Sequence, residues 1–121
     1  MSSSDPIQLT AVLGSVTSPG RLRRAVDEAL ARAQGAQTQL IDLAEQRIAF
    51  ADSRPADELG DDTAAVVEAL AGADAVLLAT PIYRGSLTGA LKNLLDHVPV
   101  SALRGTPVAL VAMGASDAAG F

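Results

Sequence analysis

Short apolar runs alternate with longer amphipathic stretches along this chain. The apolar runs are brief, rich in β-branched and leucine residues, and bounded by glycine, proline or polar positions, which is typical of buried strands. They cover Ile7–Gly14, Thr38–Leu43, Ala73–Thr80 and Thr106–Met113. The third run is apolar at successive positions, so both of its faces are expected to be covered, as in a central parallel strand.

Three stretches between these runs carry apolar residues at helical spacing. They cover Arg21–Gly35, Ala64–Gly72 and Thr88–Val98, and Asp61, Asp62 and Thr63 offer N-caps for the second. The segment 44–60 has no sustained period and is interpreted as a long loop. Strands that alternate with helices predict a parallel α/β sheet with right-handed crossovers. In such sheets ligands bind beyond the carboxyl ends of the strands.

Composition and charge narrow the function classes. Apolar residues make up 49% of the 121 residues, so one domain with one core, spanning residues 1–121, is expected. The net charge of −5 argues against non-specific nucleic-acid binding. The chain has no cysteine and one histidine, His97, so we expect no metal site. No apolar run approaches bilayer length and no signal peptide is recognisable at the start, so we expect a cytoplasmic protein that does not enter membranes.

The loop Gly14–Arg21 has the composition of an anion site. Ser15, Thr17, Ser18 and Gly20 precede a helix, whose first N–H groups and positive dipole end attract phosphate. The alternative is a loop that is rich in glycine and serine only because it turns. Three arginines on the first turns oppose the helix dipole. We interpret Arg21 as a partner for an anion, whereas Arg23 and Arg24 fit a solvated helix face equally well.

The loop Pro81–Gly89 is unusual for a strand-to-helix connection. Pro81 has no N–H and is expected to end strand pairing, and Gly85 permits a sharp bend or a close backbone approach. Tyr83, the only tyrosine, is interpreted either as a plug for the sheet end or as a contact for a planar ring. A third loop, Gly114–Ser116, follows the last strand with small residues. These three loops share the carboxyl edge, so we expect them to form one site.

The segment Pro81–Asp96 reads P-x-Y-x-G-S-x-x-G-x-L-K-N-x-L-D. Together with "GSVTSPGR" and "ALRGTPVALVAMGAS", it resembles the NAD(P)H-dependent FMN reductases of flavodoxin-like fold, most closely those that supply reduced FMN to alkanesulfonate monooxygenases. The resemblance covers nearly the whole chain. It implies a doubly wound parallel sheet of order 2-1-3-4-5, FMN at the strand ends, NADPH or NADH as the reductant, and a homodimer or homotetramer.

The resemblance also implies the residues that bind FMN. The family's first loop grips the phosphate, its second loop lines the isoalloxazine ring, and the loop after the fourth strand touches the other side of the ring. Carried over, the three sets are Ser15, Thr17, Gly20, Arg21 and Leu22; Pro81, Ile82, Tyr83, Arg84 and Gly85; and Gly114, Ala115 and Ser116. Hydride transfer itself needs no acid or base, so no catalytic residue is assigned.

The chain departs from the family's pattern in two ways. The family's first loop often reads G-S-x-R-x-x-S-x-[TN], and here Thr17, Gly20 and Leu22 stand at the arginine, serine and last positions. Fewer side chains are then offered to the phosphate, and weaker FMN binding is expected. The family also continues with a fifth strand and a last helix. We therefore expect order 2-1-3-4 with Thr106–Met113 as an apolar edge, and either a C-terminally truncated chain or an obligate oligomer that associates through the leucine face of Thr88–Val98.

The resulting functional hypothesis is an NAD(P)H-dependent FMN reductase that supplies reduced flavin to a monooxygenase. One alternative is a reductase of quinones, azo compounds or metal oxyanions with tightly held FMN. Others are a flavodoxin-type electron carrier, whose first loop resembles T-x-T-G-x-T and does not match here, and a non-catalytic flavin-binding fragment.

Overall fold

A computed structural model describes residues 5–17 and 19–114. Four parallel strands form one sheet in the order β2-β1-β3-β4, as expected. The strands are β1 (Ile7–Leu13), β2 (Ala36–Asp42), β3 (Ala75–Pro81) and β4 (Val108–Met113). The helices are α1 (Arg21–Ala31), α2 (Thr63–Ala71) and α3 (Gly89–His97), with 3-10 turns η1 (Ala56–Glu58) and η2 (Val100–Leu103).

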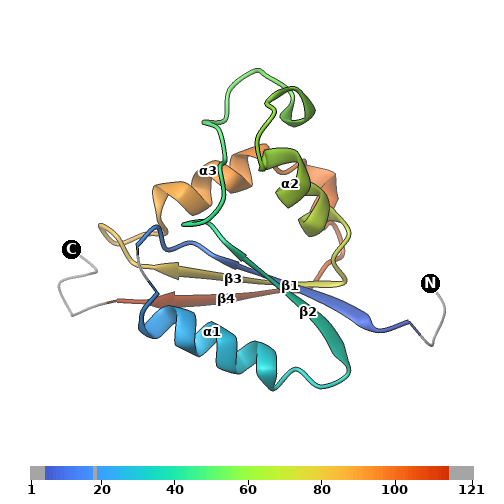
Figure 1. The fold of residues 1–121 in the computed structure, drawn as a ribbon, viewed down its shortest axis with the longest axis vertical. Coiled ribbons are helices and arrows are strands. Elements are labelled where there is room, and N and C mark those ends of the chain that lie inside the picture. The colour runs from blue at the N-terminus through green and yellow to red at the C-terminus, as the bar shows by residue number, and fades with distance from the viewer. Residues whose placement is uncertain (1–4, 18, 115–121) are drawn as a thin grey trace.

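The helices cover both faces of the sheet (Figure 1). α1 lies on one face, where Leu22 and Val26 pack with Leu13 and Leu77. α2 and α3 lie on the other, where Leu70, Leu91 and Leu94 join a second buried cluster. Both faces of β1 and β3 are thereby buried, because the crossovers on either side of the first strand run to opposite faces. The flavodoxin-like arrangement predicted from the sequence is confirmed within the described residues.

The leucine face of α3 serves the core. Leu91 is 2% and Leu94 0% exposed in the single chain. The expectation that these leucines form an association surface is therefore wrong. The apolar exposure lies instead on β4, at the edge of the described sheet, where Leu110 is 77% exposed.

Element boundaries differ slightly from those predicted. Pro81 does not end strand pairing: it is the last residue of β3, opposite Met113. The next residue continues the ladder, since the Ile82 N–H donates to the Met113 carbonyl at 3.1 Å. Pro81 needs no donor here, because position 81 faces β1, and β1 pairs with β3 only as far as Ala79.

Candidate functional site

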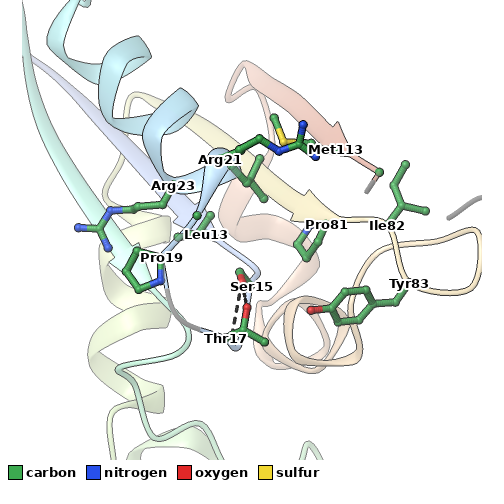
Figure 2. A pocket seen from close by; sticks show the side chains of 13 residues that line it. Leu13, Ser15, Thr17, Pro19, Arg21, Arg23, Pro81, Ile82, Tyr83 and Met113 are labelled. Atoms are coloured by element: carbon green, nitrogen blue, oxygen red, sulfur yellow. Dashed lines mark hydrogen bonds between the residues drawn. The ribbon is translucent and has the colours of Figure 1, made fainter. Parts of the chain in front are cut away.

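A pocket of about 190 Å³ opens at the carboxyl edge of the sheet (Figure 2). It lies where the β1–α1 loop, the first turn of α1, the β3–α3 loop and the end of β4 meet. Its lining residues are Leu13, Ser15, Thr17, Pro19, Gly20, Arg21, Leu22, Arg23, Pro81, Ile82, Tyr83, Met113 and Gly114. Because the strands are parallel, the ends of β1, β3 and β4 come together here although they are far apart in the sequence.

The N-terminus of α1 faces this pocket without a side-chain cap. Gly20 is the N-cap residue, and no side chain of the described residues accepts a hydrogen bond as its cap. The space beside Gly20 is open, since an added Cβ would meet nothing within 4 Å. The hydroxyls of Ser15 and Thr17 lie nearby, 3.2 Å from each other. The first N–H groups of a helix need acceptors, and an anion in this pocket would supply them.

The opposite wall is a two-residue β-hairpin. The Tyr83 N–H donates to the Ser86 carbonyl at 2.9 Å and the Ser86 N–H donates back at 3.1 Å. Between them, Arg84 has φ 54° and Gly85 φ 76°, the positive values that a type I′ turn requires at both central positions. Of the two reasons that the sequence offered for Gly85, a sharp bend and a close backbone approach, the turn conformation supports the first.

The hairpin holds Tyr83 in reach of the pocket. Tyr83 as a residue is 43% exposed, so it is not a buried plug for the sheet end. Figure 2 shows its hydroxyl directed toward Ser15 and Thr17 across the pocket. An accessible aromatic face opposite a set of hydroxyl groups suits a ligand that has a flat ring and a polar end.

The two arginines that line the pocket are held differently. Arg23 donates to the buried carboxylate of Asp42 at 3.0 Å and to Asp27 at 3.2 Å. The hydrogen bond with Asp27, and after it the negative charges of Asp27 and Asp42, raise the pKa of Arg23. Arg21 is exposed and makes no ion pair within the described residues. It extends toward Met113, whereas Arg23 points to the other side (Figure 2). The guanidinium of Arg23 is therefore already engaged in ion pairs with Asp27 and Asp42, and Arg21 is the cation that a ligand can reach.

The structure brings most of the predicted site residues together. Ser15, Thr17, Gly20, Arg21, Leu22, Pro81, Ile82, Tyr83 and Gly114 line the pocket. Arg84 and Gly85 do not, because the hairpin places them at its tip. Ser18, Ala115 and Ser116 lie outside the described residues.

Four lining residues were not predicted from the sequence: Leu13, Pro19, Arg23 and Met113. Leu13 and Met113 are the last residues of their strands, each directly before a glycine. Their position at the carboxyl edge of the sheet could have identified them as pocket residues from the sequence. Within the described part of the chain, no group of three or more His, Cys, Asp or Glu side chains is arranged to hold a metal ion. In the same residues, no helix has the length and apolar character needed to cross a membrane.

Comparisons with known proteins identify relatives of this site and fold. The chain is 42% identical over 76 residues to an NAD(P)H-dependent FAD/FMN reductase of Geobacillus thermodenitrificans, covering 63% of this chain and 41% of the relative. It is 34% identical over 115 residues to the NADH-dependent FMN reductase SfnF of Pseudomonas putida, covering 92% and 62%. The apo structure of the NADH:FMN oxidoreductase EMOB superposes with a TM-score of 0.77 at 28% identity, covering 93% and 61%.

The SfnF and EMOB matches extend over nearly all of this chain, and all three matches cover less than two thirds of the relative's length. The family model described as NADPH-dependent FMN reductase matches residues 7–121. The chain therefore belongs to the NADPH-dependent FMN reductase family.

Proposed function

We propose that this chain binds FMN in the pocket at the carboxyl edge of the sheet and reduces it with NADPH or NADH. The observation that carries the proposal is the convergence of the open N-terminus of α1 and the Tyr83 hairpin on one pocket. Bound FMN would supply the acceptor for a hydride from the nicotinamide, and the protein would bind and orient both molecules.

The residues of the pocket fit FMN. The uncapped first turn of α1, with the Ser15 and Thr17 hydroxyls and the free cation of Arg21, suits a phosphate. Ile82 and Tyr83 offer apolar and aromatic surface for the ring. Leu22, Pro81 and Gly114 complete the proposed cofactor contacts among the described residues. The first loop lacks several side chains that bind phosphate in the family. Backbone N–H groups and Arg21 take their place in this proposal.

The test is direct. Purified protein should quench FMN fluorescence on binding, and it should oxidise NADPH or NADH when FMN is added, as followed by absorbance at the nicotinamide band. A chain that binds no FMN would overturn the proposed function. A chain that binds FMN without oxidising either nucleotide would leave it a flavin-binding protein and overturn the reductase assignment.

Arg21→Ala tests the orientation of the ligand. A charge-assisted hydrogen bond contributes about 1.5–3 kcal/mol, so FMN affinity should fall roughly 10- to 150-fold. Riboflavin has no phosphate and should be affected much less. Arg24→Ala is the matched control, since Arg24 is exposed on the same helix but does not line the pocket. Equal losses for FMN and riboflavin in Arg21→Ala would contradict a phosphate role.

We further propose the setting in which the activity operates. The resemblance to alkanesulfonate-system reductases supports delivery of reduced FMN to a flavin-dependent monooxygenase in the cytoplasm. The exposed apolar side chains of Val108 and Leu110 on β4 support association into a homodimer or homotetramer. Sedimentation at micromolar and nanomolar concentrations should show a species larger than the monomer, and a monomer at all concentrations would refute the assembly.

A further inference from the structure

Thr88 occupies a buried junction between the two loops that face each other across the pocket. It is 1% exposed and is the N-cap residue of α3. Its hydroxyl accepts a hydrogen bond from the Leu91 N–H at 3.1 Å, which is the ordinary capping contact. The same hydroxyl donates to the Gly14 carbonyl at 2.7 Å, which capping does not require. This second bond joins the end of β1 to the start of α3.

A second set of bonds ties the end of β3 to the same point. The Thr88 N–H donates to the Thr80 hydroxyl at 3.1 Å, and that hydroxyl donates to the Pro81 carbonyl at 2.8 Å. The Gly14 N–H donates to the Ala79 carbonyl at 2.7 Å. Thr88 therefore bonds, directly or through Thr80, to the residues that precede both pocket loops.

The approach of β1 to α3 leaves little room for a side chain at position 14. A Cβ on Gly14 would lie 3.1 Å from the Ala79 carbonyl oxygen, 3.1 Å from Leu91 Cβ and 3.3 Å from the Thr88 hydroxyl. Such contacts are tighter than usual for a Cβ, so a larger residue at position 14 would require these neighbours to shift by a few tenths of an ångström. Glycine at position 14 and threonine at position 88 thus form one packed unit.

The two bonded carbonyls stand where the two walls of the pocket begin: Pro81 lines the pocket itself, and Gly14 is adjacent to a lining residue. Gly14 precedes Ser15, and Pro81 precedes Ile82, both of which line it. A change in the distance between Gly14 and Pro81 would therefore move the two walls relative to each other. Ser15 and Thr17 lie on one wall, and Ile82 and Tyr83 lie on the other. No side-chain hydrogen bond among the described residues joins one wall directly to the other. The side-chain hydrogen bonds of Thr88 and Thr80, together with the backbone bond from Gly14 to Ala79, link the residues at which the two walls begin.

We propose that Thr88 is a positioning residue of the flavin site. Its hydroxyl sets the spacing between the phosphate wall, formed by Ser15 and Thr17 beside the start of α1, and the ring wall, formed by Ile82 and Tyr83. This inference rests on the proposed function in one respect, that the ligand spanning both walls is FMN. A ligand that uses only one wall does not depend on the spacing. Thr88 should therefore matter more for FMN than for riboflavin, which has no phosphate to hold at the α1 wall.

The test compares Thr88→Val, Thr88→Ser and Thr63→Val with the parent. Thr88→Val keeps the shape and removes the hydroxyl, and Thr88→Ser restores it. Thr63→Val is the matched control, because Thr63 is also fully buried at a helix start, its hydroxyl accepts from the Ala49 N–H at 3.3 Å, and it does not line the pocket. FMN and riboflavin affinities are measured by flavin fluorescence, at temperatures where urea unfolding shows each variant to be folded.

Thr88→Val should weaken FMN binding about tenfold, the loss expected for one hydrogen bond that organises a site, and riboflavin binding about twofold. Thr88→Ser and Thr63→Val should stay within about twofold of the parent for both ligands. FMN binding by Thr88→Val equal to that of the parent would overturn the proposal. So would equal losses for FMN and riboflavin, or an equal FMN loss in Thr63→Val, since either would reduce Thr88 to a general structural role.

If Thr88→Val fails to fold, Thr80→Val takes its place. It removes the other link to the same junction at a half-buried position and should also weaken FMN more than riboflavin. Hydrogen exchange without ligand separates this proposal from the proposed function. Exchange at 15–17 and 82–83 should rise in the Thr88 or Thr80 variant and not in Thr63→Val. A parent that binds no FMN overturns the proposed function, and unchanged exchange in these loops overturns the positioning role independently.

Discussion

Gly85→Ala tests whether the hairpin turn, rather than space for a ligand, requires glycine at this position. Gly85 has φ 76° within the Tyr83–Ser86 hairpin. An L-residue in this left-handed region costs about 1–2 kcal/mol. Alanine also restricts the unfolded chain, which offsets about 0.4–1 kcal/mol. The net loss is therefore about 1 kcal/mol, with a larger loss for Gly85→Val because its side chain is β-branched.

The strain at position 85 can lower either the free energy of unfolding or the affinity for FMN. If the turn keeps its shape, the free energy of unfolding falls by about 1 kcal/mol, or roughly 0.5 M in the urea midpoint. The hairpin is exposed at a loop tip, so we expect it to relax in part and to require reordering when FMN binds. A cost of about 1 kcal/mol at that step weakens FMN binding about fivefold.

Gly35→Ala is the matched control for this substitution. Gly35 has φ 81°, is also exposed and has open space around it. It precedes β2 and therefore lies at the amino edge of the sheet, away from the pocket. Gly35→Ala should lower stability by a similar amount and leave FMN affinity unchanged. The reasoning is refuted if Gly35→Ala weakens FMN as much as Gly85→Ala does, or if Gly85→Ala changes neither stability nor affinity.

Three further substitutions probe the fold. Arg84→Asn should raise the free energy of unfolding by about 0.5–1 kcal/mol in urea titrations, because asparagine tolerates the φ of 54° better than arginine does; a less stable variant would contradict this. Leu94→Ala should lower the free energy of unfolding by about 2–5 kcal/mol, since this side chain of α3 is fully buried in the core, and a loss below about 1 kcal/mol would show that the core collapses around the gap. Hydrogen bonds from the Thr63 N–H and hydroxyl, and then from the Ala49 N–H, hold the pKa of Asp61 below its ordinary 3.8. The stabilisation by this carboxylate is therefore present above pH 3.8 and lost as pH falls through the lower folded value. Asp61→Asn should therefore be less stable than the parent near neutral pH and approach it in acid, and a difference that does not depend on pH would exclude the carboxylate as its source.

Much of the fold follows from local patterns. The four apolar runs became strands within two residues of their predicted ends, and β3 includes Pro81, which had been expected to end the pairing. The alternation of strands and helices predicted a parallel sheet because short connections leave few other topologies. The 3-10 turn Ala56–Glu58 was not predicted, since one turn in a long loop leaves no periodic signal.

The sequence by itself determined the family and the edge of the sheet that holds the pocket, because motif residues and strand ends are read position by position along the chain. Only the tertiary structure decided which side chains face that pocket. Arg23 lines the pocket but is held in an ion pair by Asp42, which is buried at the end of β2. Arg84 is carried to a hairpin tip by a turn type that depends on two backbone angles. Thr88 meets Gly14 across 74 positions of sequence, a contact set by strand register and helix packing together, which no local pattern encodes.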